Sequence, residues 1–204
     1  MDRKLETLIQ QIFMLFMRNG IKSMTMDDIS RELSISKKTI YKHFVDKSDL
    51  VNQVMQFHID SDKKLTEVFL KNSLNAIDEM FEIAKNSTNN IKEIHPSTYY
   101  DLQKYYPQAW NNFMEYKTDY VYSCIVSNME KGINEGLYRD SINIPVIAKI
   151  YVSRIDLCID SSVFPPDKYT FKEVLVEMMR YHIRGIATDK GINYMSEKIK
   201  DFTI

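Results

Sequence analysis

Residues 25–47 constrain the fold of this chain more than any other stretch, because they contain two short amphipathic helical patterns in a row. Thr25 stands three residues before Asp28, which is a capping-box pattern with Asp in place of the usual Glu or Gln. After a break at Ser34-Ile35-Ser36, the hydroxyl of Ser36 can cap a second helix that covers roughly residues 37–44. Two short helices joined by a tight turn predict a helix–turn–helix.

The second of these helices has one apolar face and one basic, hydrogen-bonding face. Ile40 and Phe44 repeat at i and i+4, so they face inward and leave the basic residues outside. A helix–turn–helix places its second helix in the DNA major groove, where base edges and phosphates are within reach. The sequence therefore predicts a DNA-binding surface made of Thr25, Ser36, Lys37, Lys38, Thr39, Tyr41, Lys42, His43 and Lys47.

The distribution of charge agrees with a local DNA-binding surface. The whole chain has a net charge of −1, which by itself does not suggest a nucleic-acid partner. Residues 1–50, however, carry nine Lys or Arg against seven Asp or Glu, and residues 36–47 carry four Lys against one Asp. Basic charge confined to one segment is expected when one face meets phosphates and the remainder of the protein does not.

At these positions the chain resembles the TetR family of bacterial transcriptional regulators. The matching elements follow in order as Thr25, Ile29-Ser30, Ser34-Ile35-Ser36, Thr39-Ile40-Tyr41-Lys42-His43-Phe44, Lys47 and Leu50. One departure is Ser34, where the family usually has Gly, so a left-handed backbone there would be strained. The resemblance implies an N-terminal three-helix DNA-binding domain and a following helical domain that binds an effector and forms a dimer.

Helical periodicity continues through the rest of the chain, while alternation typical of strands is scarce, so the predicted fold class is all-α. We expect about nine or ten helices, with a helix–turn–helix domain at residues 1–47 and a ligand-binding and dimerisation domain at residues 48–204. The polar stretch 86–96 is predicted as a loop. Further expected elements are a helix capped by Asp46, a long helix over 107–131, a capping box at Thr170 and Glu173, and a terminal helix over 192–203.

Aromatic residues are concentrated at positions 99–120, where eight rings occur within 22 residues. Small-molecule pockets are mainly apolar and aromatic, with a few polar groups that fix orientation. An ordinary hydrophobic core has the same composition, so the pattern alone leaves both interpretations open. The resemblance favours a pocket, because TetR-like proteins usually hold their effector between helices 4 and 7. The predicted residues for an apolar or aromatic effector are Tyr99, Leu102, Tyr106, Trp110, Phe113, Tyr116, Tyr120 and Cys124.

Residues 144–161 and 171–187 each form a helical pattern with apolar residues around most of the circumference. Such a helix must be buried on more than one side. One side can pack on the rest of the domain, and the other needs a partner or a central place in a monomer. The resemblance implies a homodimer in which these two helices pair with their copies. The predicted interface residues are Ile150, Tyr151, Leu157, Val174, Met178, Met179 and Ile183.

Neither catalysis nor a metal site is indicated by the sequence. The histidines are scattered, at His43, His58, His95 and His182. No HExxH, GxSxG or glycine-rich phosphate loop occurs. Cys124 and Cys158 match no zinc or disulfide spacing, which favours a reducing cytoplasm. We therefore expect no enzyme activity, cofactor, membrane span or targeting segment.

Together these patterns predict a cytoplasmic, dimeric transcriptional regulator, expected to act as a repressor that binds a palindromic operator and is released by a small molecule. One alternative is an all-α small-molecule-binding protein or enzyme in which the helix–turn–helix is only structural. A second alternative is a helical adaptor that binds another protein. Lys37, Lys38 and Lys42 favour DNA, because helix packing does not require these charges.

Overall fold

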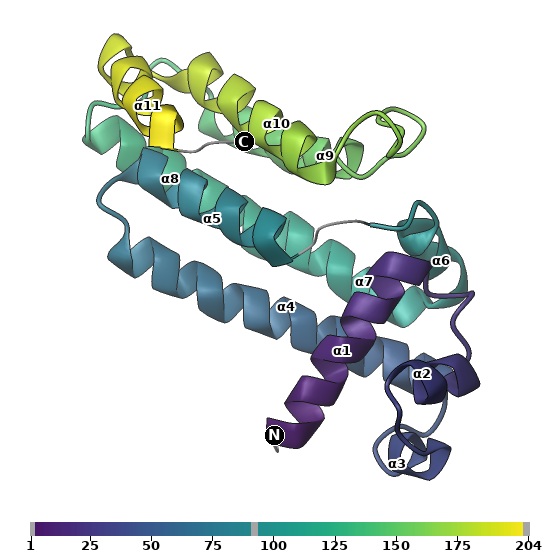
Figure 1. Cartoon of the computed structure of the whole chain (residues 1–204). Helices are drawn as coiled ribbons and strands as arrows, with labels where there is room; N and C mark the ends of the chain where they lie inside the picture. The colour runs from purple at the N-terminus through teal and green to yellow at the C-terminus, as the bar shows by residue number, and fades with distance from the viewer. Residues whose placement is uncertain (1–2, 91–93, 202–204) are drawn as a thin grey trace. The chain divides into compact units, whose positions relative to one another are not determined.

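The computed structural model describes residues 3–90 and 94–201, which are mostly helical (Figure 1). The β-type pairing in this described part is one isolated antiparallel bridge between Tyr138 and Ala187. The prediction of an all-α fold is therefore confirmed. The helices group into two compact units, Met1–Lys64 with Glu93–Tyr116 and Leu65–Lys92 with Lys117–Ile204.

The first unit contains the helix–turn–helix. Its helices are α1 (Arg3–Asn19), α2 (Met26–Glu32), α3 (Lys37–Tyr41), α6 (Thr98–Tyr105) and α7 (Pro107–Glu115). The long helix α4 (Lys47–Asn72) begins in this unit and continues into the second. Most of the aromatic segment therefore belongs to the same compact unit as the helix–turn–helix, while the domain boundary expected at residue 47 stays a prediction.

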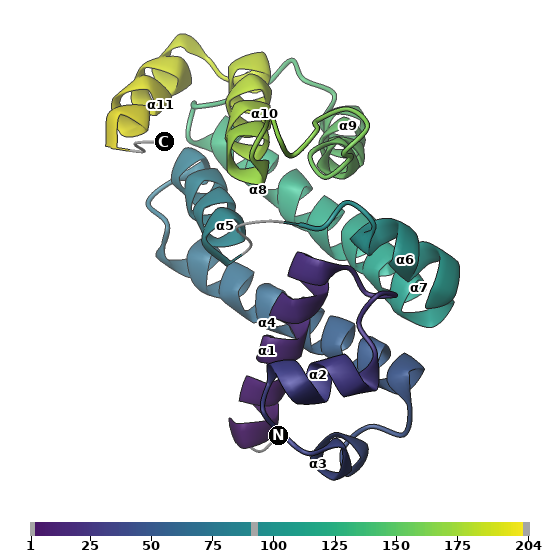
Figure 2. The ribbon, with the colours of Figure 1, turned by 45° about the vertical axis from the view of Figure 1, so that its right-hand side comes forward.

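The second unit is built around a group of longer helices. Along the chain these are α5 (Ala76–Asn90), the π-helical segment η1 (Tyr116–Val121, whose first residue belongs to the first unit), α8 (Tyr122–Asn134), α9 (Ile144–Leu157), α10 (Phe171–Ile186) and α11 (Asp189–Asp201). Helices α9 and α10 lie side by side in both views of the ribbon (Figures 1 and 2). They are the two helices whose sequences are apolar around most of their circumference.

Both predicted capping boxes form. The hydroxyl of Thr25 accepts the backbone N–H of Asp28 at 3.1 Å, and the carboxylate of Asp28 accepts the N–H of Thr25 at 3.0 Å. The same reciprocal pair joins Thr170 and Glu173, at 3.2 Å and 2.8 Å. Each box satisfies two backbone donors that a helix start otherwise leaves unpaired, so these two patterns fix where α2 and α10 begin.

A small hydrophobic core holds the helix–turn–helix together. Apolar residues spaced by three and four positions along α1 turn one side of that helix inward. Burying one large aliphatic or aromatic side chain stabilises a fold by about 1.5–3 kcal/mol. Deeply buried members of this core include Ile9, Ile12, Phe16, Ile29, Ile40, Phe44 and Leu50.

The second unit has its own core, in which α8 approaches Tyr138 closely. A Cβ atom on Gly132 would lie 2.0 Å from the ring of Tyr138, so only glycine allows this approach. The hydroxyl of Tyr138 donates to the side-chain oxygen of Asn128 at 3.3 Å. The amide of Asn128 donates to the buried carboxylate of Glu79 at 2.8 Å, and Lys131 forms an ion pair with the same carboxylate. Tyr138, Asn128 and Glu79 thus satisfy one another in this core.

Several elements differ from the sequence predictions, beginning with α3, which ends at Tyr41 rather than near residue 44. Helix α5 continues to Asn90, although the stretch 86–96 is predicted as a loop; residues 91–93 of that loop lie outside the described residues. Ser87 and Thr88 donate their hydroxyls to backbone carbonyls one turn back, which lets polar residues continue the helix. The predicted helix over 107–131 contains the π-helical segment η1, and the terminal helix begins at Asp189 rather than near residue 192.

Candidate functional site

The turn between α2 and α3 is tight and locally strained. Ser34 has a φ of 53°, in the left-handed region where a residue with a Cβ costs about 1–2 kcal/mol. The hydroxyl of Ser30 donates to the carbonyl of Ile35 at 2.5 Å. The hydroxyl of Ser36 accepts the N–H of Thr39 at 3.1 Å, as predicted for the cap of α3. Hydrogen bonds on both sides of the turn thus offset the strain at Ser34.

Helix α3 presents the predicted polar surface. Ile40 and the following Phe44 are buried, which leaves the opposite side of the helix free. Lys37 is exposed and forms an ion pair with Asp27 of α2. His43 is half-buried, with its ring near that of Phe44. The exposed residues of the predicted DNA-binding surface are Thr25, Ser36, Lys37, Lys38, Thr39, Tyr41 and Lys42.

Lys47 differs from the other predicted contact residues because it is half-buried. Its Nζ donates to the backbone carbonyl of Lys22 at 3.0 Å and lies 5.8 Å from the centre of the Tyr106 ring. Burial lowers the pKa of Lys47, and the carboxylate of Asp101 acts in the opposite direction. Lys47 therefore connects the start of α4 to the loop between α1 and α2.

Helix α6 is bonded to the same loop through residues that the sequence did not single out. The carboxylate of Asp101 is buried and accepts the backbone N–H of Lys22 at 2.9 Å and the hydroxyl of Ser97 at 3.0 Å. Nζ of Lys22 donates to the hydroxyl of Tyr105 at 2.7 Å. Asp101 and Lys22 are 79 positions apart, and no local pattern predicts their pairing. The loop that leads into the helix–turn–helix is thus fixed to the helix beside the aromatic segment.

Three of the predicted effector residues meet in the first unit. The rings of Tyr99 and Phe113 have their centres 5.5 Å apart, and those of Trp110 and Phe113 are 6.0 Å apart. All three are half-buried, whereas Leu102 and Tyr106 are buried. The other predicted effector residues are Tyr116, whose hydroxyl bonds to Asp62, and Tyr120 and Cys124, which belong to the second unit.

The predicted dimer residues divide into exposed and buried groups. Ile150 is 41% exposed and Leu157 is also exposed, both on α9. Val174 and Met178 are half-buried. Those that pack into the core of the second unit are Tyr151, Met179 and Ile183. Periodicity alone predicted that all of these positions are buried, either within the chain or against a partner. The exposed positions are the ones available to a partner.

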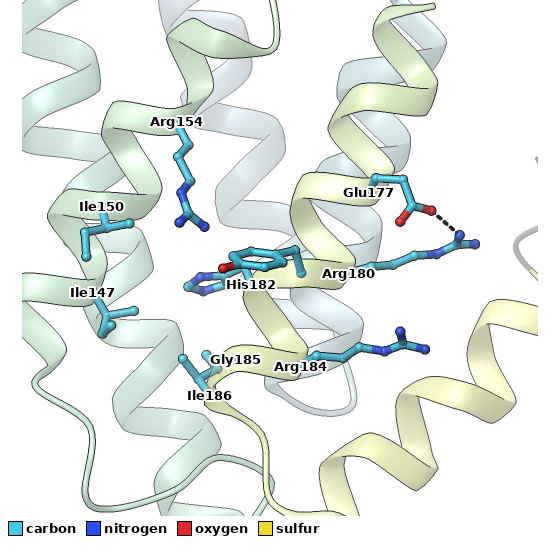
Figure 3. Close-up of a pocket in the computed structure, with 10 residues that line it drawn as sticks. Ile147, Ile150, Arg154, Glu177, Arg180, His182, Arg184, Gly185 and Ile186 are labelled. Carbon is cyan, nitrogen blue, oxygen red and sulfur yellow. Dashed lines mark hydrogen bonds and ion pairs between the residues drawn. The ribbon is translucent and has the colours of Figure 1, made fainter. Parts of the chain in front are cut away.

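A groove of about 480 Å³ lies between α9 and α10 (Figure 3). Ile147, Ile150 and Arg154 line it on the α9 side, and Tyr181, which is 66% exposed, lines it on the α10 side. The guanidinium of Arg154 lies 4.8 Å from the centre of the Tyr181 ring. His182 points towards α9 and packs edge-on against the ring of Tyr151 at 4.6 Å. The groove thus combines apolar and charged side chains from both helices.

We expect the stability of the fold to fall as the pH drops from about 6.5 towards 4, partly because of His182. Burial, assisted by the charge of Arg154, lowers the pKa of His182 to about 4. Between these values the unfolded chain binds a proton that the folded chain excludes. The stability contributed by neutral His182 is therefore intact above pH 6.5 and is lost progressively as the pH falls towards 4. The corresponding decrease in the free energy of unfolding amounts to roughly 3 kcal/mol. Melting temperatures of wild type and His182→Gln, measured from pH 7.5 to 4.5, should converge as the pH falls; parallel curves would contradict this.

Two findings limit the kinds of site in the described residues. Within residues 3–90 and 94–201, no three metal-ligating side chains of the His, Cys, Asp or Glu type gather into a possible metal site. In the same ranges, none of the helices combines the length and apolar character needed to cross a membrane.

The fold and the exposed basic surface of α3 define a helix–turn–helix regulator of transcription. Residues 8–54 match the model of the bacterial regulatory proteins of the tetR family. Along nearly its whole length the chain is similar to the HTH-type transcriptional regulator YvaF of Bacillus subtilis, with 22% identity over 191 residues that cover 93% of this chain and 97% of YvaF.

Two solved structures share the fold. The regulatory protein TetR of Rhodobacter sphaeroides aligns with a TM-score of 0.70 and 13% identity, covering 88% of this chain and 96% of that one. A transcriptional regulator of Saccharomonospora viridis in complex with choline aligns with a TM-score of 0.68 and 15% identity, covering 91% and 98%. The chain thus carries a helix–turn–helix domain of the tetR-family type at residues 8–54 and shares the fold of solved transcriptional regulators over about nine-tenths of its length. These relatives are regulators of transcription, not enzymes.

Proposed function

We propose that this protein is a repressor that binds a palindromic operator as a homodimer in the bacterial cytoplasm. The observation that carries the proposal is the outer surface of α3, where Lys38 and Lys42 are exposed opposite buried Ile40 and Phe44. Lysines at the start of a recognition helix reach base edges, and those around it reach phosphates. We retain residues 1–47 as the DNA-binding domain and residues 48–204 as the effector and dimer domain.

Dimer formation is supported by an apolar stripe on α9. Val146, Ile150 and Leu157 recur at i, i+4 and i+11, so they lie on one side of the helix, and all three are exposed. Isolated apolar residues at a surface are ordinary, but a stripe beside a groove indicates a binding surface. A two-fold dimer would also present two recognition helices to two half-sites of one operator.

An apolar or aromatic effector is the proposed signal that releases the DNA. The half-buried ring cluster of Tyr99, Trp110 and Phe113 supports a site for it, and the Saccharomonospora viridis regulator in complex with choline is a protein of this fold with a small molecule bound. Effector binding beside α6 would act on the loop that Asp101 fixes at Lys22. It would thereby shift the fraction of molecules whose helix–turn–helix can bind DNA.

Lys38→Ala and Lys47→Ala should affect DNA binding differently. Lys38 lies where base edges come within reach, so its loss should relax sequence preference, by about 1–3 kcal/mol at one position. Lys47→Ala should weaken binding to all sequences alike and lower the slope of log affinity against log salt by about one per subunit. Fluorescence anisotropy with a selected operator and a scrambled duplex, at several salt concentrations, measures both effects.

Lys64→Ala is the matched control, because Lys64 is exposed on α4 outside the proposed surface. It should leave affinity and sequence preference unchanged. Since Lys47 also bonds to the carbonyl of Lys22, the melting temperature of Lys47→Ala should be measured in parallel. If Lys38→Ala and Lys47→Ala both kept the wild-type affinity, sequence preference and salt slope, the proposed DNA-binding surface would be refuted.

A further inference from the structure

Helix α10 carries two acidic residues followed by two basic residues on its outer side. Glu173 and Glu177 lie in the first half of the helix, and Arg180 and Arg184 lie in the second half. Figure 3 shows Glu177, Arg180 and Arg184 extending from the same side of α10, and all three residues also line the groove between α9 and α10. Glu173, Glu177 and Arg184 are exposed, and Arg180 is half-buried.

These four residues form one narrow surface, which we call the charged stripe. An α-helix turns by about 100° per residue, which places all four within a sector of about 60°. Within a single chain, Glu177 forms an ion pair with Arg180 at 2.5 Å, and Glu173 accepts hydrogen bonds from Thr170. Arg184 is exposed at the C-terminal end of the stripe. The stripe is thus acidic at one end and basic at the other.

This order of charges is complementary to itself when two copies run antiparallel. A two-fold axis places opposite each other those residues of the two helices that are equally distant from the axis. Glu177 and Arg180 share one midpoint with Glu173 and Arg184, so a single axis there brings both acid–base pairs into register. A parallel arrangement would instead place Glu opposite Glu and Arg opposite Arg, which is repulsive.

We propose that the charged stripe of α10 pairs antiparallel with the stripe of a second copy, so that Glu177 faces Arg180 and Glu173 faces Arg184 across the interface. This inference rests on the proposed homodimer and specifies its register. The apolar stripe of α9 supplies contact area, while the charged stripe makes one alignment favourable and repels chains with another charge order. The partner that fits this surface is therefore another copy of the same chain.

Charge reversals test the register. Glu177→Arg places two arginine pairs across the axis, and Arg180→Glu places two glutamate pairs there, so each variant alone should dimerise roughly 100-fold more weakly than wild type. An equimolar mixture of the two variants restores opposite charges at both contacts and should form heterodimers. The chain with both substitutions should recover the homodimer. Sedimentation velocity, with one variant carrying a fluorescent label, measures each case.

The controls separate this inference from the proposed function. Lys172→Glu reverses an exposed charge of α10 outside the stripe and should dimerise as wild type does. If Arg180→Glu does not fold by circular dichroism, Arg184→Glu provides a second reversal at an exposed position, and it should also weaken the dimer. Wild-type dimerisation in the reversed variants, or failure of the mixture to recover, would overturn the register and leave the homodimer standing. A monomeric wild type would overturn the homodimer itself.

Discussion

Ile150→Glu should convert the proposed dimer into a folded monomer. Ile150 is 41% exposed on α9 and lines the groove beside α10, so the chain itself does not need its side chain in the core. In the proposed dimer, the new carboxylate would be buried against apolar groups without a partner, which costs about 3 kcal/mol or more. Association should weaken by at least about 100-fold. Light scattering across a dilution series measures the change.

The monomer should also bind an operator much more weakly, because only one recognition helix would be held on the DNA. Val68→Glu is the matched control, since Val68 is an exposed apolar residue on α4 and its replacement should leave the dimer intact. Met179→Glu is unsuitable as a probe, because Met179 is buried in the core and the variant would unfold. Ile150→Glu that remains dimeric at nanomolar concentration would show that α9 does not form the interface.

The parts of this fold that the sequence predicted are those governed by local rules. A hydroxyl three residues before a carboxylate predicted the starts of α2 and α10, because both partners lie within one helical turn. The cap of α4 follows the same rule, since Asp46 accepts the N–H of Asp49 at 2.8 Å. The inward side of α3 was predictable for a similar reason: Ile40 and Phe44 are one turn apart, and both are buried.

The contacts that the sequence did not predict join residues far apart in the chain. The carboxylate of Asp101 reaches the backbone of Lys22, and nothing in the neighbourhood of either residue indicates the other. Where a helix is apolar around most of its circumference, as α9 is, periodicity also could not tell which side packs against the rest of its own chain. Ile150 and Tyr151 are neighbours with similar hydrophobic character, yet the first is exposed and the second is buried. Only the packing of α9 against other helices decides between them.

The second large effect should be the dependence of DNA binding on salt. Each subunit of the proposed dimer would present Lys37, Lys38 and Lys42 on α3 or just after it, with Lys47 at the start of α4. Neutralising phosphates releases bound counterions, so affinity falls steeply as salt is added. A dimer that makes about six phosphate contacts should lose about 1000-fold in affinity between 50 and 200 mM salt. A monomer with half of these contacts should show about half the slope.

The most direct test of the account is selection of bound sequences from a random DNA pool, followed by anisotropy titrations of the selected site at 50–200 mM salt. We expect a palindromic site whose two half-sites are about one helical turn apart. Its affinity for the protein should fall about 1000-fold between 50 and 200 mM salt. A complete site should bind one dimer, and a single half-site should bind far more weakly. Failure to enrich any sequence, or an affinity that salt does not change, would contradict the conclusion that α3 reads DNA.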